Sequence, residues 1–243
     1  MKTRQQLPGL FYPVHNTVRI LNPHRFPTGG GGSSFPVVEG TATSGRATNS
    51  TTQTVSLPSS IASGELLLII IRTGNTSVTH TTPSGWSLLP AGTIGSGQTS
   101  IFYKTASGSE GSTVNVTSSG TRTFAAVAAR ISGWSSISSF GLNNSTGIDP
   151  PSFTPAGGSD DILWIACGSS RQTPPITAAP TNFSGLVTGY STSTHDTSVL
   201  QCLCTMATRE HTVSTEDPGA FTADTSTASL NSEHSETIAI YPA

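Results

Sequence analysis

The chain has 243 residues, of which 10% are charged and 34% hydrophobic, and Ser, Thr and Gly dominate the remainder. This length allows one large all-β domain or two smaller domains. The longest aliphatic run, at 66–71, has six residues and is too short for a membrane-spanning helix of about 20 apolar residues. The net charge of -2 conceals a division: residues 1–38 carry +4, and the following thirteen acids and seven basic residues leave -6. Such a division favours a basic segment that meets an acidic surface, and a solvated tail is the alternative.

Residues 1–35 are expected to form an extended N-terminal arm that ends in a glycine-rich linker. Four prolines exclude a long helix and interrupt any sheet ladder, and the glycines at 29–32 are typical of a flexible linker. The arm has apolar clusters that it cannot bury alone, so we expect it to bind a partner. The expected contact residues are Leu10, Phe11, Tyr12, Val18, Arg19, Ile20, Arg25 and Phe26.

We expect the partner of the arm to be a protein surface rather than nucleic acid. Four positive charges without interleaved aromatic residues would give only a weak, salt-sensitive contact with phosphates. The charged start of the chain has no apolar stretch behind it, so the sequence shows no recognisable secretion signal. In this context the three cysteines are expected in the core, although Cys167 could pair with either Cys202 or Cys204.

After residue 35 the chain has the pattern of a β protein. The six aliphatic residues at 66–71 lie between turn-forming glycines and do not alternate with polar residues, which predicts a strand buried on both faces. Further strands of the first half are expected at 37–40, 51–57, 86–89, 98–105, 114–116 and 123–131.

The same order of elements returns in the second half of the chain. Asp161 leads into the apolar run 162–167, as Glu65 leads into the first buried strand. The segment 179–186, with its Pro and Gly, stands where 82–88 stood in the first half. This recurrence indicates an internal duplication with a unit of roughly ninety residues.

The Ser-, Thr- and Gly-rich composition predicts an all-β fold, and the duplication predicts that residues 36–243 form a β-sandwich built from two similar halves. The two similar halves are expected at about 50–133 and 150–243, joined by a connection rich in Gly, Asn and Pro at 141–155. Neither half has enough apolar faces to be stable alone, so we expect them to pack as one sandwich with pseudo-twofold symmetry. Two tandem sandwiches are the alternative.

The sequence contains no recognisable catalytic motif: it lacks a Gly-x-Ser-x-Gly elbow, a His-Glu-x-x-His pair and a Cys-x-x-Cys pair. The His-Asp pair at 195–196 and the Glu-His pair at 210–211 are adjacent, and neighbours in a strand point to opposite faces. The acid pairs at 160–161 and 216–217 occupy expected turns, where Asp and Glu are common. We therefore predict no catalytic residue, no metal site and no cofactor.

Four aromatic residues, Trp86, Tyr103, Trp134 and Trp164, could form a platform on which a sugar ring stacks. Core packing is the more common role for aromatic residues inside apolar runs. Trp134, which lies between Ser and Gly residues, is the one expected to be exposed, and it is the candidate ligand-binding residue.

The segments 62–68, 83–89 and 106–111, with their counterparts in the second half, resemble a recurrent β-sandwich module of phage virion proteins and bacterial surface proteins. The resemblance covers most of 50–243 and does not extend to the arm. It implies a jelly-roll-like structural or binding domain without catalysis, and a likeness of fold alone does not identify a function.

Together these observations predict a non-enzymatic virion structural protein, a capsid decoration or cement protein attached through its arm. Its expected partners are the major capsid protein or another virion protein and further copies of itself, with no membrane or nucleic acid, in a virion assembled in the host cytoplasm. The alternative is a receptor- or carbohydrate-binding module of a head or tail fibre or bacterial surface protein, which requires an exposed aromatic cluster. A hydrolase on the same scaffold would need clustered acids that the sequence does not display.

Overall fold

All regular secondary structure in the described part of the chain is β-strand, which confirms the all-β prediction. The computed structural model describes residues 34–243, except 75–77, 90–98, 145–146, 193–194, 196–200 and 227. The predictions about residues 1–33 of the arm therefore lie outside the described residues. Within the described ranges, no helix is long and apolar enough to cross a bilayer.

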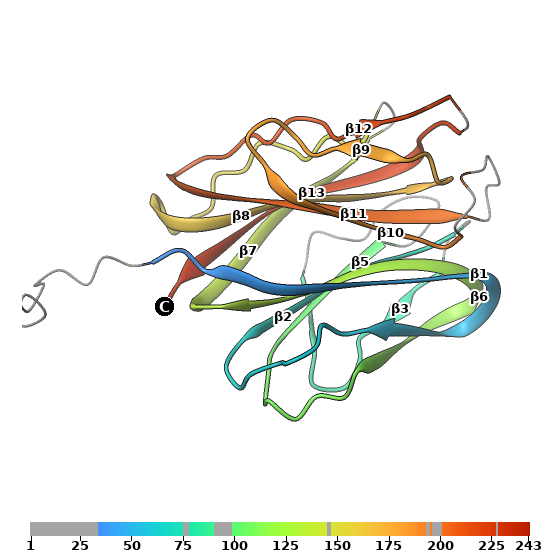
Figure 1. The fold of residues 1–243 in the computed structure, drawn as a ribbon, viewed down its shortest axis with the longest axis horizontal. Helices are drawn as coiled ribbons and strands as arrows, with labels where there is room; N and C mark the ends of the chain where they lie inside the picture. The colour runs from blue at the N-terminus through green and yellow to red at the C-terminus, as the bar shows by residue number, and fades with distance from the viewer. Residues whose placement is uncertain are drawn as a thin grey trace, which may run out of the picture. The chain divides into compact units, whose positions relative to one another are not determined.

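The first sheet is built from the first half of the chain. Its hydrogen-bonded order is β1-β6-β2-β5-β4, all neighbours are antiparallel, and β3 pairs with β6 (Figure 1). The strands are β1 (Val37–Ser56), β2 (Leu66–Thr73), β3 (His80–Thr81), β4 (Ser87–Leu88), β5 (Thr99–Thr105) and β6 (Thr113–Ser132).

The second sheet is built from the second half, in the order β10-β11-β8-β13-β7, and a small sheet pairs β9 with β12. The strands are β7 (Trp134–Asn144), β8 (Asp160–Arg171), β9 (Ile176–Ala178), β10 (Ser184–Tyr190), β11 (Cys202–Val213), β12 (Thr222–Ala223) and β13 (Asn231–Pro242).

The two large sheets repeat one strand order. Reading the first sheet as β1-β6-β2-β5-β4 and the second as β7-β13-β8-β11-β10, each strand has a counterpart at the same position. The chain passes from one sheet to the other at Gly133, whose φ of +68° suits a residue without a side chain. The shared order supports the internal duplication and makes each half one layer of a single sandwich.

The second half begins earlier in the structure than in the sequence-based prediction. The sequence places it at 150–243 after a connection at 141–155, but β7 follows Gly133 directly and continues to Asn144. Two pairs of expected strands in the first half are also continuous, because β1 and β6 each extend over 20 residues. The Ser-, Thr- and Gly-rich stretches within these strands resemble loops in composition, since an exposed strand needs little apolar sequence.

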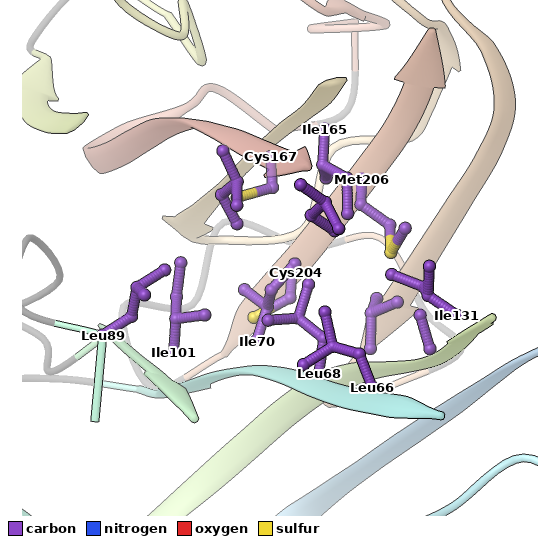
Figure 2. Close-up of a cluster of buried hydrophobic side chains, with 14 of the residues drawn as sticks. Leu66, Leu68, Ile70, Leu89, Ile101, Ile131, Ile165, Cys167, Cys204 and Met206 are labelled. Atoms are coloured by element: carbon purple, nitrogen blue, oxygen red, sulfur yellow. The ribbon is translucent and has the colours of Figure 1, made fainter. Parts of the chain in front are cut away.

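The inner faces of the sheets share one apolar core. Side chains of β2 on one layer point toward side chains of β8 and β11 on the other (Figure 2). The core includes Leu66, Leu68, Ile70, Ile101, Ile131, Leu163, Ile165, Cys167, Cys204, Met206, Ile238 and Ile240. Because both halves contribute to this cluster, they form one sandwich and not two tandem ones.

All eight residues of β2 are buried, which confirms the prediction of a strand enclosed on both faces. Its outer face, with Ile69 and Ile71, is covered by Val55 and Val116 from the far ends of β1 and β6. Register shifts in β1 between Arg46 and Thr52 mark the irregularity that precedes this covering segment. Each fully buried aliphatic side chain contributes roughly 1.5–3 kcal/mol to folding.

The outer face of the second sheet is also covered by residues of its own half, here from connecting segments. Trp164 and Ala166 of β8 pack beneath Ile148, Phe183 and Phe221, which belong to the connecting segments. Each half is therefore a sheet with its own cover, and the two halves meet through their inner faces.

Two glycines allow β10 of the second sheet to approach β1 and β6 of the first sheet closely. A Cβ atom built on Gly45 would overlap the carbonyl oxygen of Tyr190, and one built on Gly189 would overlap that of Ala126. Neither position has room for a side chain without a backbone shift. The backbones of the two layers are thus in direct contact along one stretch of the seam.

We expect Gly189→Ala to lower the free energy of unfolding by about 1–3 kcal/mol, because the added methyl group forces the layers apart. Gly111→Ala is the matched control: the nearest heavy atom to a Cβ at Gly111 is 4.0 Å away. Urea unfolding of both variants measures the difference. Equal midpoints for the two would contradict the close approach of β10 to β6.

Candidate functional site

A groove lies along the seam between β1 and β10, next to the glycine contact. It consists of two adjoining hollows of about 460 and 350 Å³ that share Val38 and Thr208. The first is lined by Val37, Leu163, Asn182, Ser184, Arg209 and Glu210 in addition. The second continues past Glu39, Gly40, Thr41, Gly185, Leu186, Val187 and Met206.

The groove combines an apolar floor with a polar rim. Val38 and Val187 pack against the shared core, while Glu39 and Glu210 are exposed on the rim. The described residues that line it include no histidine or cysteine. Its apolar and hydrogen-bonding side chains are of the kinds through which proteins bind ligands.

Arg209, a basic residue that lines the groove, is already paired. Arg209 Nη1 lies 2.7 Å from Glu216 Oε1, and His211 Nδ1 lies 2.9 Å from Glu216 Oε2. Glu216 is buried, and its backbone forms a bridge with Phe153. His211 pairs with Glu216, whereas its neighbour Glu210 lines the groove. The two members of the adjacent Glu-His pair therefore lie in different surroundings. Glu216 therefore links Arg209 and His211 of β11 to the segment of Phe153, which packs on the outer face of the second sheet.

The acid pair at 160–161 also has local structural partners. Asp160 Oδ1 accepts a hydrogen bond from the backbone N–H of Asp161 at 2.8 Å, and Asp161 Oδ1 accepts one from the hydroxyl of Thr212 at 2.7 Å. In the described ranges, no three His, Cys, Asp or Glu side chains are grouped closely enough to hold a metal ion.

Arg72 is a fully buried cation that joins the two layers. Its Nη1 donates to Ser169 Oγ at 3.1 Å and its Nη2 to the carbonyl oxygen of Ser232 at 2.7 Å, both on the opposite sheet. Burial lowers its pKa to about 10. On the second sheet, the buried His234 and Glu236 form a further pair at 3.1 Å. Arg72 therefore forms a polar cross-link between the layers, whereas His234 and Glu236 pair within β13.

The three cysteines are free and buried, which confirms their predicted place in the core. Burial raises the pKa of each thiol, that of Cys202 to about 11. The Sγ atoms of Cys202 and Cys204 donate at 3.4 Å to the carbonyl oxygens of Arg72 and Ala125 on the facing layer. Neutral, enclosed thiols of this kind are poor nucleophiles.

The described histidines are dispersed over the fold. His195 Nδ1 lies 2.6 Å from the carbonyl oxygen of Thr173, and its ring meets Tyr190 edge-on. Asp196, the expected neighbour of His195, lies outside the described residues. His80 Nδ1 lies 2.9 Å from Ser100 Oγ, and burial lowers the pKa of its imidazole to about 4.

Trp134, the expected ligand-binding residue, is partly buried rather than exposed. It packs against the shared core, and its Nε1 donates to the carbonyl oxygen of Gly64 at 2.9 Å. Trp164 is fully buried. The exposed aromatic residue that sequence analysis missed is Phe140, which is 43% exposed. Phe140 lies between the last strand expected in the first half and the connection expected at 141–155, and only its alternation with Leu142 signals a strand there.

Comparison of the chain with protein families, curated proteins and solved structures found no match.

We expect His80 to make the protein less stable as the pH falls from 6.5 to 4. The unfolded chain binds a proton on His80 in this range and the folded chain does not, so stability present above pH 6.5 is lost. The loss is at most about 3 kcal/mol. Urea unfolding at pH 7 and pH 4.5 measures it, and the dependence should be smaller in His80→Gln. An unchanged dependence in that variant would contradict the burial of a neutral His80.

Proposed function

We propose that this chain is a non-enzymatic virion structural protein, a capsid decoration or cement protein fastened to the major capsid protein by its N-terminal arm. The observation that carries the proposal is the division of the sequence. A proline-rich segment with apolar clusters and a charge of +4 over residues 1–38 precedes a body with a charge of -6.

The surface of the body supports assigning attachment to the arm. Of the large hydrophobic side chains in the described residues, those that are exposed are Val37, Leu88, Phe140 and Leu142. Both outer faces of the sandwich are covered by the protein's own segments. Burial of apolar surface is the main driving force for stable association, and the arm supplies more of that surface in one segment.

An extended segment can bind along another protein by backbone pairing, with alternate side chains entering pockets. In the arm, Leu10, Phe11 and Tyr12 form one apolar group and Phe26 another anchor, while Arg19 and Arg25 suit acidic patches of the shell. The free cysteines of the core are compatible with assembly inside a cell.

Deletion of residues 1–33 should abolish binding to particles that lack this protein, while leaving the sandwich folded. The deletion ends before Phe35 and Pro36, because these residues are partly and fully buried in the body. Co-sedimentation with particles measures binding, and circular dichroism measures the fold. The expected loss of affinity is at least about a hundredfold.

Two full-length variants locate the effect within the arm. Replacement of Leu10, Phe11 and Tyr12 by Ser should weaken binding, whereas Gln5→Ser with Gln6→Ser serves as the matched polar control and should not. A folded body that binds particles as tightly as the full chain would overturn the proposal.

A further inference from the structure

The strand β7 presents an open edge. It is the outermost strand of the second sheet, and its partner among the described strands is β13. Its free side therefore offers backbone N–H and C=O groups for pairing. The 11 residues, Trp-Ser-Ser-Ile-Ser-Ser-Phe-Gly-Leu-Asn-Asn, include no charged residue and no proline. Charges and prolines are the usual means by which edge strands avoid pairing with another chain, so β7 lacks this protection.

The other sheet edges in the described part of the chain are less suited to pairing. β1 and β10 lie against each other at the seam, where Gly45 and Gly189 bring the layers into contact. β1 also has three register shifts. β4, at the far edge of the first sheet, has two residues. Among these edges, β7 combines length, regular pairing with its neighbour and an uncharged sequence.

An apolar pair lies on β7 beside the open edge. Phe140 is 43% and Leu142 44% exposed, and residues two apart in a strand share one face. The Phe140 ring stacks on Phe153 at a centroid distance of 6.3 Å, and Phe153 meets the buried Trp164 edge-on at 6.5 Å. This row of rings holds Phe140 in place from the core outward, so little side-chain entropy is lost when a partner covers it.

We propose that β7 pairs antiparallel with β7 of a second copy of this chain, joining their second sheets across a twofold axis. The sequence of β7 favours this occupant: an edge strand without charges and with alternate apolar residues is complemented by a strand of the same pattern, which β7 of a second copy supplies. A twofold axis at Gly141 places Phe140 opposite Leu142 of the second copy, and the symmetry repeats this contact. Glycine at the axis leaves room for the two backbones.

The mass of the full-length protein in solution tests this pairing. Sedimentation equilibrium should give a dimer of twice the 25.0 kDa chain mass. Leu142→Lys places a positive charge beside the partner strand, twice per dimer, and should weaken self-association by about tenfold or more. Leu88→Lys is the matched control, because Leu88 is 42% exposed on β4. It should leave the dimer intact.

A wild-type protein that remains monomeric in solution overturns the proposal. Pairing of β7 with a capsid protein instead of a second copy would also give this monomer, and it overturns the proposal equally. Equal self-association of Leu142→Lys and Leu88→Lys overturns it as well. Because both leucines are exposed, neither change removes a core contact, and circular dichroism verifies that each variant is folded.

A cross-linking experiment tests the register independently. Phe140→Cys and Leu142→Cys chains, co-expressed and treated with oxidised glutathione, should form a disulfide between copies, because the axis places these positions opposite each other. Each variant alone should cross-link less, since identical positions are then diagonal neighbours. The native cysteines are buried and do not compete. Absence of the mixed disulfide, or its formation at no higher yield than in the single variants, would overturn this pairing.

Discussion

The structure depends on the burial of β2 on both faces. A strand with six consecutive aliphatic residues cannot leave either face in water, so one layer must pack on its inner face and another segment must cover its outer face. The second half supplies the inner layer, and the far ends of β1 and β6 supply the cover. β8 imposes the same requirement on the second half, which explains why two repeats form one sandwich.

The close fit of the layers determines where binding can occur. At Gly45 and Gly189 the sheets are in backbone contact, and beside them a groove with an uncharged floor opens. Inside, Arg72 donates hydrogen bonds to a hydroxyl and a carbonyl group of the facing layer, so this cation links the two sheets. Both outer faces of the body are covered by its own segments, and its thiols are enclosed.

The buried strands were predictable because their signal is purely apolar. The runs at 66–71 and 162–167, their acidic leads and the Pro-Gly turns after them identified the duplication and the sandwich. β7 was not predictable by the same means, since Ser and Asn in an exposed edge strand have the composition of a loop. The position of Trp134 depends on the crossover at Gly133, where the indole reaches Gly64 of the other layer. The groove and the Arg72 cross-link arise from tertiary contacts that no local pattern encodes.

The central claim is that this protein is an abundant component of a virus shell. The measurement that tests it most directly is the copy number of the chain relative to the major coat protein in purified particles, obtained by quantitative mass spectrometry. A decoration role predicts an amount comparable with that of the coat protein. Absence of the chain from purified particles would contradict a role in the virion. A trace amount would contradict shell decoration and indicate a position in a fibre or tail.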